Sequence, residues 1–260
     1  MYIHNLDPVL ISVGIIEIRW YSLAYILGIL IGWWLGKKIL VFKAKTQNFT
    51  LNLTNFDNLI SYLIISIIIG GRLGYVIFYN LDYFISNPID ILKIWEGGMS
   101  FHGGLIGVVV GTYFFSKKSN TEAFIFLDII ACVSPIGLFL GRVANFINGE
   151  LFGKPTNVPW SVIFSKTDNI PRHPSQLYEA SLEGILLFII LISIIYNRNL
   201  KNGFCSGIFL ILYGFFRIFC EKFREPDGHL GYLFDLFTMG TFLSSIMIFV
   251  GTIILFRIKK

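Results

Sequence analysis

The run FIFLDIIACVSPIGLFL (residues 124–140), followed directly by GRVANFINGELFG (141–153), decides the class of this protein. The first string is almost wholly apolar and is close to the ~20 residues that an α-helix needs to cross a bilayer. The second string then places Arg142, Asn145 and Glu150 at what should be a membrane boundary. An arginine near hydrocarbon costs roughly 2.5–3.5 kcal/mol on insertion scales, so it normally has a partner or a task. A lone arginine would indicate a side chain that snorkels at a helix end. The neighbouring amides and the carboxylate favour a polar site instead.

The composition supports membrane insertion. Hydrophobic residues make up 55% of the chain and charged residues only 14%, whereas soluble domains carry about 25% charged residues. The three cysteines lie in apolar runs without the spacing of a zinc site or a disulfide framework, so we interpret them as small buried side chains. The sequence therefore predicts an integral membrane protein.

Seven apolar stretches are each near the length of a membrane span. They cover about 21–40, 58–78, 99–116, 123–141, 176–196, 204–220 and 233–256. The predicted fold class is an all-α polytopic membrane protein with seven transmembrane helices in one bundle. Neither a long polar linker nor an internal repeat is evident, so residues 1–260 are predicted to form a single domain. A short outer-face segment is expected around 145–175.

The charges indicate the topology. The net charge is +5, but lysine and arginine concentrate in one alternate set of loops and in the C-terminal tail, whereas acidic residues gather in the other set. The positive-inside rule then places the C-terminus in the cytoplasm and the N-terminus outside. The positive charge is a topology signal, so no nucleic-acid partner is expected. Residues 1–20 lack a cationic start and a cleavage site, which argues against a cleavable signal peptide and favours an interfacial segment.

Glycines recur at every fourth position in several of the apolar stretches. Examples are Gly70 and Gly74 in the second stretch, and Gly103 and Gly107 in the third. This spacing places small residues on one helix face, where they allow neighbouring backbones to approach closely. The pattern predicts tight helix packing and carries no chemistry of its own.

Several polar residues are expected near the outer boundary of the membrane. His102 lies between pairs of glycines at the outer start of the third stretch, and an imidazole suits proton transfer at neutral pH. Arg142 and Arg224 are expected on the same side, and Arg72 deeper in the second stretch. A proton acceptor beside converging arginines is suited to a phosphate-bearing lipid headgroup. These residues alone indicate a phospholipid site without defining a reaction.

Longer strings resemble the prolipoprotein diacylglyceryl transferase family. They are GGRLGYVIFYN (70–80), WEGGMSFHGGLIG (95–107), GRVANFINGELFG (141–153), RHPSQLYEA (172–180) and FREPD (223–227). The resemblance implies a seven-helix enzyme of the bacterial inner membrane that uses no cofactor. Its partners would be phosphatidylglycerol in the lipid bilayer and prolipoprotein signal peptides. It would transfer the diacylglyceryl group to the lipobox cysteine thiol, forming a thioether and releasing glycerol-1-phosphate.

The resemblance also implies catalytic residues. The essential histidine of the family falls on His102, its phosphatidylglycerol-binding arginine on Arg142, and its distal arginine on Arg224. Our hypothesis is that His102 accepts or relays the thiol proton, because a cysteine with a pKa near 8.5 is mostly protonated at neutral pH. Arg142 and Arg224 would hold the phosphate and stabilise the charge that develops on the leaving group.

The resemblance implies four further substrate-binding positions, which are Tyr21, Asn145, Glu150 and Gly153. Arg72, in the second apolar stretch, is also predicted to bind substrate. Asn145 and Glu150 would orient the arginines and the glycerol hydroxyls. The alternative is a purely structural role, as a helix cap and an arginine counter-ion.

Other classes of membrane protein fit the sequence less well. No cluster of His, Asp or Glu has the spacing of metal ligands, so no metal site is predicted. A multi-pass transporter of an anionic lipid or solute is the alternative function, although transporters more often show internal repeats and broken helices.

Overall fold

The structure is a computed structural model that describes residues 2–14, 16–47, 53–225 and 238–259. Its described residues are mostly helical, and the chain divides into two compact units. The first comprises Met1–Lys43 with Asp128–Lys260, and the second Ala44–Leu127. Helices α1 (Trp20–Gln47) and α5 (Ala123–Asn148) contribute residues to both units.

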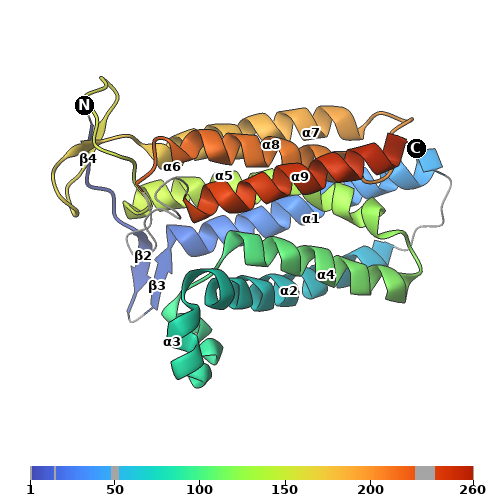
Figure 1. Cartoon of the computed structure of the whole chain (residues 1–260), viewed down its shortest axis with the longest axis horizontal. Coiled ribbons are helices and arrows are strands. Elements are labelled where there is room, and N and C mark those ends of the chain that lie inside the picture. The colour runs from blue at the N-terminus through green and yellow to red at the C-terminus, as the bar shows by residue number, and fades with distance from the viewer. Residues whose placement is uncertain (1, 15, 48–52, 226–237, 260) are drawn as a thin grey trace. The chain divides into compact units, whose positions relative to one another are not determined.

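The unit Ala44–Leu127 is built on two long helices that lie side by side (Figure 1). Its elements are α2 (Leu53–Tyr79), α3 (Leu81–Ser86), the short 3₁₀ helices η1 (Pro88–Leu92) and η2 (Ile94–Glu96), and α4 (Phe101–Ser119). A Cβ atom on Gly103 would lie 2.3 Å from the carbonyl oxygen of Gly70, and one on Gly107 would lie 2.1 Å from that of Ser66. Only glycine permits such an approach, so the predicted tight packing of these two helices is confirmed.

The N-terminal end of α4 is well defined. The Ser100 hydroxyl accepts a hydrogen bond from the backbone N–H of Gly103 at 3.2 Å, which caps the helix. At the other end, Asn120 adopts a left-handed conformation with φ 48° and terminates it. The Ser100 cap therefore fixes the first turn of α4, which carries His102.

The unit containing the two chain ends carries the remaining elements. They are β1 (Tyr2–His4), β2 (Val9–Val13), β3 (Ile16–Arg19), α1, α5, β4 (Val162–Phe164), β5 (Pro171–Arg172), α6 (Ser175–Glu179), the π-helical η3 (Ala180–Leu186), α7 (Leu187–Ile195), α8 (Phe204–Glu221) and α9 (Met239–Lys259). Helices α8 and α9 pack along each other, since a Cβ on Gly214 would lie 2.8 Å from the Ser244 carbonyl oxygen. Figure 1 shows α8 in orange beside α9 in red.

Short strands organise the non-helical part of this unit. Strand β1 pairs in parallel with β4, which pairs antiparallel with β5, and β2 and β3 form a separate hairpin. His4, only 2% exposed, packs against the rings of Phe146 and Phe164 at 5.2 and 5.1 Å. The N-terminal strand is therefore held against the C-terminal end of α5 and the segment after it.

Six helices within the described residues are long and apolar enough to cross a membrane. They are Trp20–Gln47, Phe56–Tyr79, Ala123–Asn148, Ser175–Ile195, Phe204–Glu221 and Met239–Ile258. The protein is thus a polytopic, mostly α-helical membrane protein. The predicted number of seven spans is not confirmed. Helix α4 occupies the expected third span, but its glycines, His102 and two terminal lysines make it less apolar than the other six.

The boundaries of several spans differ from the sequence prediction. The first span was expected to end near residue 40, but α1 continues to Gln47. The fourth span was expected to end at residue 141, but α5 continues to Asn148, so Arg142 and Asn145 are helical residues. The seventh span was expected to begin at residue 233, which lies outside the described residues, and α9 is described from Met239.

Candidate active site

Arg142 on α5 is bound by two carboxylates of the next membrane helix. Its Nε lies 2.9 Å from an oxygen of Glu179, and its Nη2 lies 3.2 Å from an oxygen of Glu183. Both carboxylates are completely buried, and the Arg142 side chain is 14% exposed. Buried charges are tolerated only when they are paired, so the three residues form one interdependent group.

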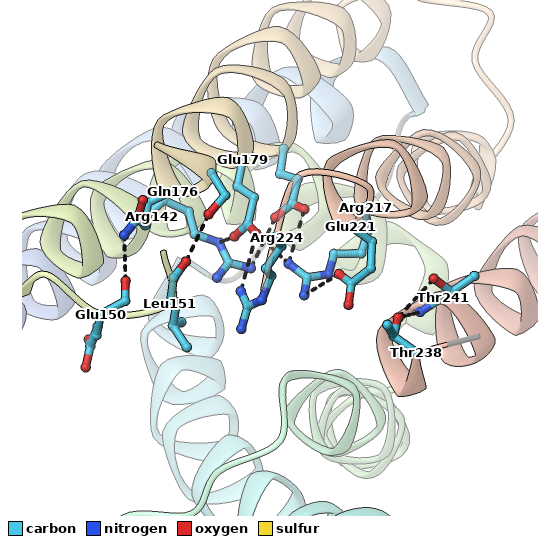
Figure 2. A network of polar contacts seen from close by, with 12 residues as sticks. Arg142, Glu150, Leu151, Gln176, Glu179, Arg217, Glu221, Arg224, Thr238 and Thr241 are labelled. Atoms are coloured by element: carbon cyan, nitrogen blue, oxygen red, sulfur yellow. Dashed lines mark hydrogen bonds and ion pairs between the residues drawn. The ribbon is translucent and has the colours of Figure 1, made fainter. Parts of the chain in front are cut away.

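Two further arginines extend this group. Nη1 of Arg217 on α8 lies 2.9 Å from Glu179 and 3.8 Å from Glu183, and its Nη2 lies 2.9 Å from Glu221. Arg224, which follows α8, places its Nη1 3.3 Å from the same Glu179 oxygen. Glu179 therefore contacts all three arginines (Figure 2). We call these six residues the arginine–glutamate cluster: Arg142, Glu179, Glu183, Arg217, Glu221 and Arg224.

The local structure explains why the two acids of α6 and η3 reach the cluster together. Residues Ala180–Leu186 form a π-helical turn directly after Glu179, and such turns often occur at functional sites. A Cβ on Gly184 would lie 2.6 Å from the Cβ of Phe139, so α5 passes very close to this turn. Since Arg142 follows Phe139 by about one helix turn, this approach brings its guanidinium to the carboxylates.

The end of α5 forms a second polar group. Nδ2 of Asn145 donates to the Glu150 carboxylate at 2.7 Å. The Gln176 side chain donates to the backbone carbonyl of Glu150 at 2.7 Å, and the Ser175 hydroxyl donates to that of Leu151 at 3.0 Å. Gln176 and Ser175 are fully buried. They therefore fix the turn that carries Glu150.

Gly153 lies in backbone contact with the chain segment of Arg224. The two residues form an isolated antiparallel bridge, and the Gly153 N–H donates to the carbonyl of His173 at 2.9 Å. A Cβ at position 153 would lie 2.4 Å from that carbonyl oxygen and 2.6 Å from the carbonyl oxygen of Phe223. Only glycine fits here, and the fit sets the position from which Arg224 reaches Glu179.

A salt bridge outside the spans secures the same segment. The Arg172 guanidinium donates to both carboxylate oxygens of Asp168, to Glu225 at 3.1 Å and to the carbonyl of Gly153 at 3.0 Å. Arg172 thereby holds the pKa of Asp168 below its usual value of 3.8. The residue ties the loop 153–172 to the start of the segment after α8.

Tyr21 lies near the N-terminal end of α1, and its ring is 5.1 Å from that of Tyr25. Tyr25 in turn lies close enough to Glu150 and Arg142 to interact with their charges. The predicted residue Tyr21 is therefore one helix turn from a side chain beside the polar residues of α5.

His102 and Arg72 belong to the unit Ala44–Leu127. His102 is 8% exposed in the first turn of α4. The Arg72 guanidinium donates to five backbone carbonyls of the loop that precedes α4, including those of Asp90 at 2.6 Å and Gly97 at 2.5 Å. Arg72 thus organises the loop that leads to His102, and its predicted contact with substrate stays a prediction.

The structure brings together most of the predicted residues of the first unit. Arg142 and Arg224 share Glu179, Asn145 binds Glu150, and Gly153 pairs with Arg224. The proximity of His102 to them stays a prediction. Sequence reasoning missed the acidic half of the cluster and its third arginine, Arg217. Charged residues inside apolar stretches were the available signal, because they are rare in membrane spans and normally pair with one another.

Comparison with known proteins identifies the family. The model of the family described as prolipoprotein diacylglyceryl transferase matches residues 8–257. A Rickettsia felis protein named phosphatidylglycerol–prolipoprotein diacylglyceryl transferase is 50% identical over 250 residues, which cover 95% of each chain. Proteins of the same name from Rickettsia bellii and Rickettsia typhi are 49% and 47% identical, covering 97% and 100% of this chain and 95% and 100% of theirs. The chain therefore belongs to the prolipoprotein diacylglyceryl transferase family.

Proposed function

We propose that this protein transfers the diacylglyceryl group of phosphatidylglycerol to the lipobox cysteine thiol of prolipoprotein signal peptides. The product is a thioether-linked lipid, and glycerol-1-phosphate is released. Family membership and the names of the relatives support this activity. The comparisons give no support to the alternative of a transporter. The observation that carries the proposal is the arginine–glutamate cluster, in which three guanidinium groups converge at one place in a membrane protein.

The reaction needs a site that grips a phosphate and stabilises a leaving group. The cysteine sulfur attacks carbon 3 of the lipid glycerol while the bond from that carbon to the phosphate ester oxygen breaks, and its electron pair stays on the oxygen. Negative charge therefore builds on the phosphate in the transition state. Guanidinium groups match a phosphate with paired hydrogen bonds. Arg142 and Arg224 are the proposed phosphate ligands, and Arg217 supports them through the shared Glu179.

The thiol must also lose a proton. Since its unperturbed pKa is near 8.5, a proton acceptor raises the fraction of reactive thiolate at neutral pH. His102 is the proposed acceptor or relay. In this proposal Arg72 acts on it indirectly, because Arg72 binds the loop from which α4 and His102 continue.

The remaining predicted residues shape the headgroup site. Asn145 and Glu150 are held together at the end of α5, where they offer an amide and a carboxylate to glycerol hydroxyls. Gly153 keeps Arg224 in place through the backbone, and Tyr21 is proposed to line the lipid site from α1.

The membrane arrangement follows the charge distribution. We propose that α4 also crosses the membrane, as the third of seven spans. All spans then act as one domain in the bacterial inner membrane, and the segment around 145–175 faces outward. The N-terminus then lies outside and the C-terminus in the cytoplasm, as the distribution of lysine and arginine indicates. A substrate in the outer leaflet would meet the end of α5 that carries Arg142.

A reconstitution experiment tests the function. Purified protein in vesicles of phosphatidylglycerol is mixed with a lipobox peptide, and both thioether formation and glycerol phosphate release are measured. The expected result is equal amounts of both products, and neither product with a Cys-to-Ser peptide. Release of glycerol phosphate without peptide modification would contradict the proposal.

A further inference from the structure

The charges of the arginine–glutamate cluster balance in the part of the chain that the structure describes. Three guanidinium groups and three carboxylates are linked into one group by ion pairs (Figure 2). Formally the cluster is neutral when all six groups are ionised. It is also largely removed from water, because Glu179 and Glu183 are completely buried and the arginines nearly so.

Binding of the lipid changes this balance. A phosphodiester keeps one negative charge at all physiological pH values, so its arrival adds one negative charge to the cluster. An uncompensated charge is unfavourable in a buried site. Uptake of one proton by a carboxylate offsets that added charge, and it also frees an arginine to bind the phosphate. This argument rests on the proposed function, since it takes the phosphate of phosphatidylglycerol as the ligand.

The contacts single out one of the three carboxylates. Glu179 is held by three arginine contacts at 2.9, 2.9 and 3.3 Å, and Glu221 by an ion pair with Arg217 at 2.9 Å. Glu183 has longer contacts, 3.2 Å to Arg142 and 3.8 Å to Arg217. A carboxylate with weaker ion pairs gives up its charge more readily.

The surroundings of Glu183 come from three elements. Groups that act on it electrostatically are Arg142 of α5, Glu179 of α6, and Tyr213, Arg217 and Cys220 of α8. The neighbouring carboxylate of Glu179 repels a charge on Glu183, so it favours the protonated form. The two arginines oppose protonation until the phosphate takes over their hydrogen bonds.

We propose that Glu183 takes up one proton when the headgroup phosphate of phosphatidylglycerol binds to the arginines of this cluster. Lipid binding and proton uptake are thereby coupled. The coupling makes Glu183 a specificity-determining residue, because one proton compensates a singly charged phosphodiester but not a doubly charged phosphomonoester.

The test measures equilibrium binding of short-chain phosphatidylglycerol to the purified full-length protein at several pH values between about 6.5 and 8.5. Uptake of one proton weakens binding by up to about tenfold for each unit of pH increase. Glu183→Gln keeps the shape of the side chain but cannot take up the proton, so the steep dependence should disappear and binding at the highest pH should tighten. Glu183→Asp retains a titratable group and should retain the dependence. Glu17→Gln is the matched control, because Glu17 is exposed and pairs with Arg19 outside the cluster.

The outcomes separate the coupling from the function. Loss of the pH dependence in Glu183→Gln alone supports the coupling. A wild-type affinity that does not change with pH, or an equal dependence in wild type and Glu183→Gln, overturns it even when lipid transfer is intact. Absence of both phosphatidylglycerol binding and peptide modification in the wild type would overturn the proposed function and the coupling together.

Discussion

Replacing Arg142 by alanine should abolish most of the activity and destabilise the protein to a smaller extent. The substitution removes a guanidinium that is proposed to bind the leaving phosphate, and loss of one such charge-stabilising donor typically lowers the rate about 100–1,000-fold. It also deprives Glu179 of a contact at 2.9 Å and Glu183 of one at 3.2 Å. Breaking a buried ion pair costs about 3–5 kcal/mol. The lower end applies here, because Glu179 keeps two arginines and Glu183 keeps Arg217.

Two measurements on the same preparation separate these effects. Thermal unfolding in detergent reports stability, and the initial rate of lipobox-peptide modification in vesicles reports activity per folded protein. Arg142→Lys keeps the charge, but a single ammonium group cannot span both carboxylates as the guanidinium does. We therefore expect it to recover stability more than rate. Arg198→Ala, in the exposed loop after α7, is the matched control and should change neither. Near-normal turnover of folded Arg142→Ala would refute the reasoning.

Three further predictions follow from the packing and the charges. Gly103→Val should separate α2 from α4 and cause loss of folded protein in membranes, since even a Cβ would lie 2.3 Å from the backbone oxygen of Gly70. Normal expression and a normal melting temperature of this variant would contradict the packing. Asp128→Ala should destabilise the protein by about 3–5 kcal/mol in thermal unfolding, because it removes the buried ion pair between Lys43 and Asp128 at 3.1 Å. The double variant with Lys43→Met should recover much of the lost stability. Because the pKa of Asp168 is lowered, its pairing with Arg172 stabilises the protein at pH values above the usual carboxyl pKa of 3.8. This contribution to stability is lost as the pH falls below that value. Proteolysis of the loop 153–172 should accordingly increase below about pH 4 in the wild type, and Asp168→Asn should show the same susceptibility at neutral pH.

The helices could be predicted from the sequence because hydropathy and glycine spacing are local signals. The apolar stretches reappear as helices, and Gly70 and Gly103 meet as the spacing indicates. The end of α5 could not be predicted. Arg142 and Asn145 look like residues beyond a helix, but they remain helical because Glu179 pairs with Arg142 and Glu150 binds Asn145. Glu150 is near in the sequence, whereas Glu179 becomes a neighbour of Arg142 only through tertiary packing.

Only part of the candidate site could be predicted from the sequence. Arg142 and Arg224 were recognised by their motifs, and charged residues within apolar stretches could also have drawn attention to Glu183 and Arg217. Their assembly around Glu179 depends on the close approach of α5 to the π-helical turn and on the packing of α8, which no local pattern encodes. The parallel pairing of β1 with β4 was missed for the same reason, since these strands are separated by most of the chain.

The central claim is that the arginines of the cluster bind the phosphate of the lipid substrate. An experimental structure of the protein with phosphatidylglycerol tests it most directly. The account predicts that phosphate oxygens lie about 2.7–2.9 Å from guanidinium nitrogens of Arg142 and Arg224, with at least one of the present contacts to Glu183 or Glu179 lengthened. A headgroup bound elsewhere, with all the arginine–carboxylate contacts unchanged, would contradict it.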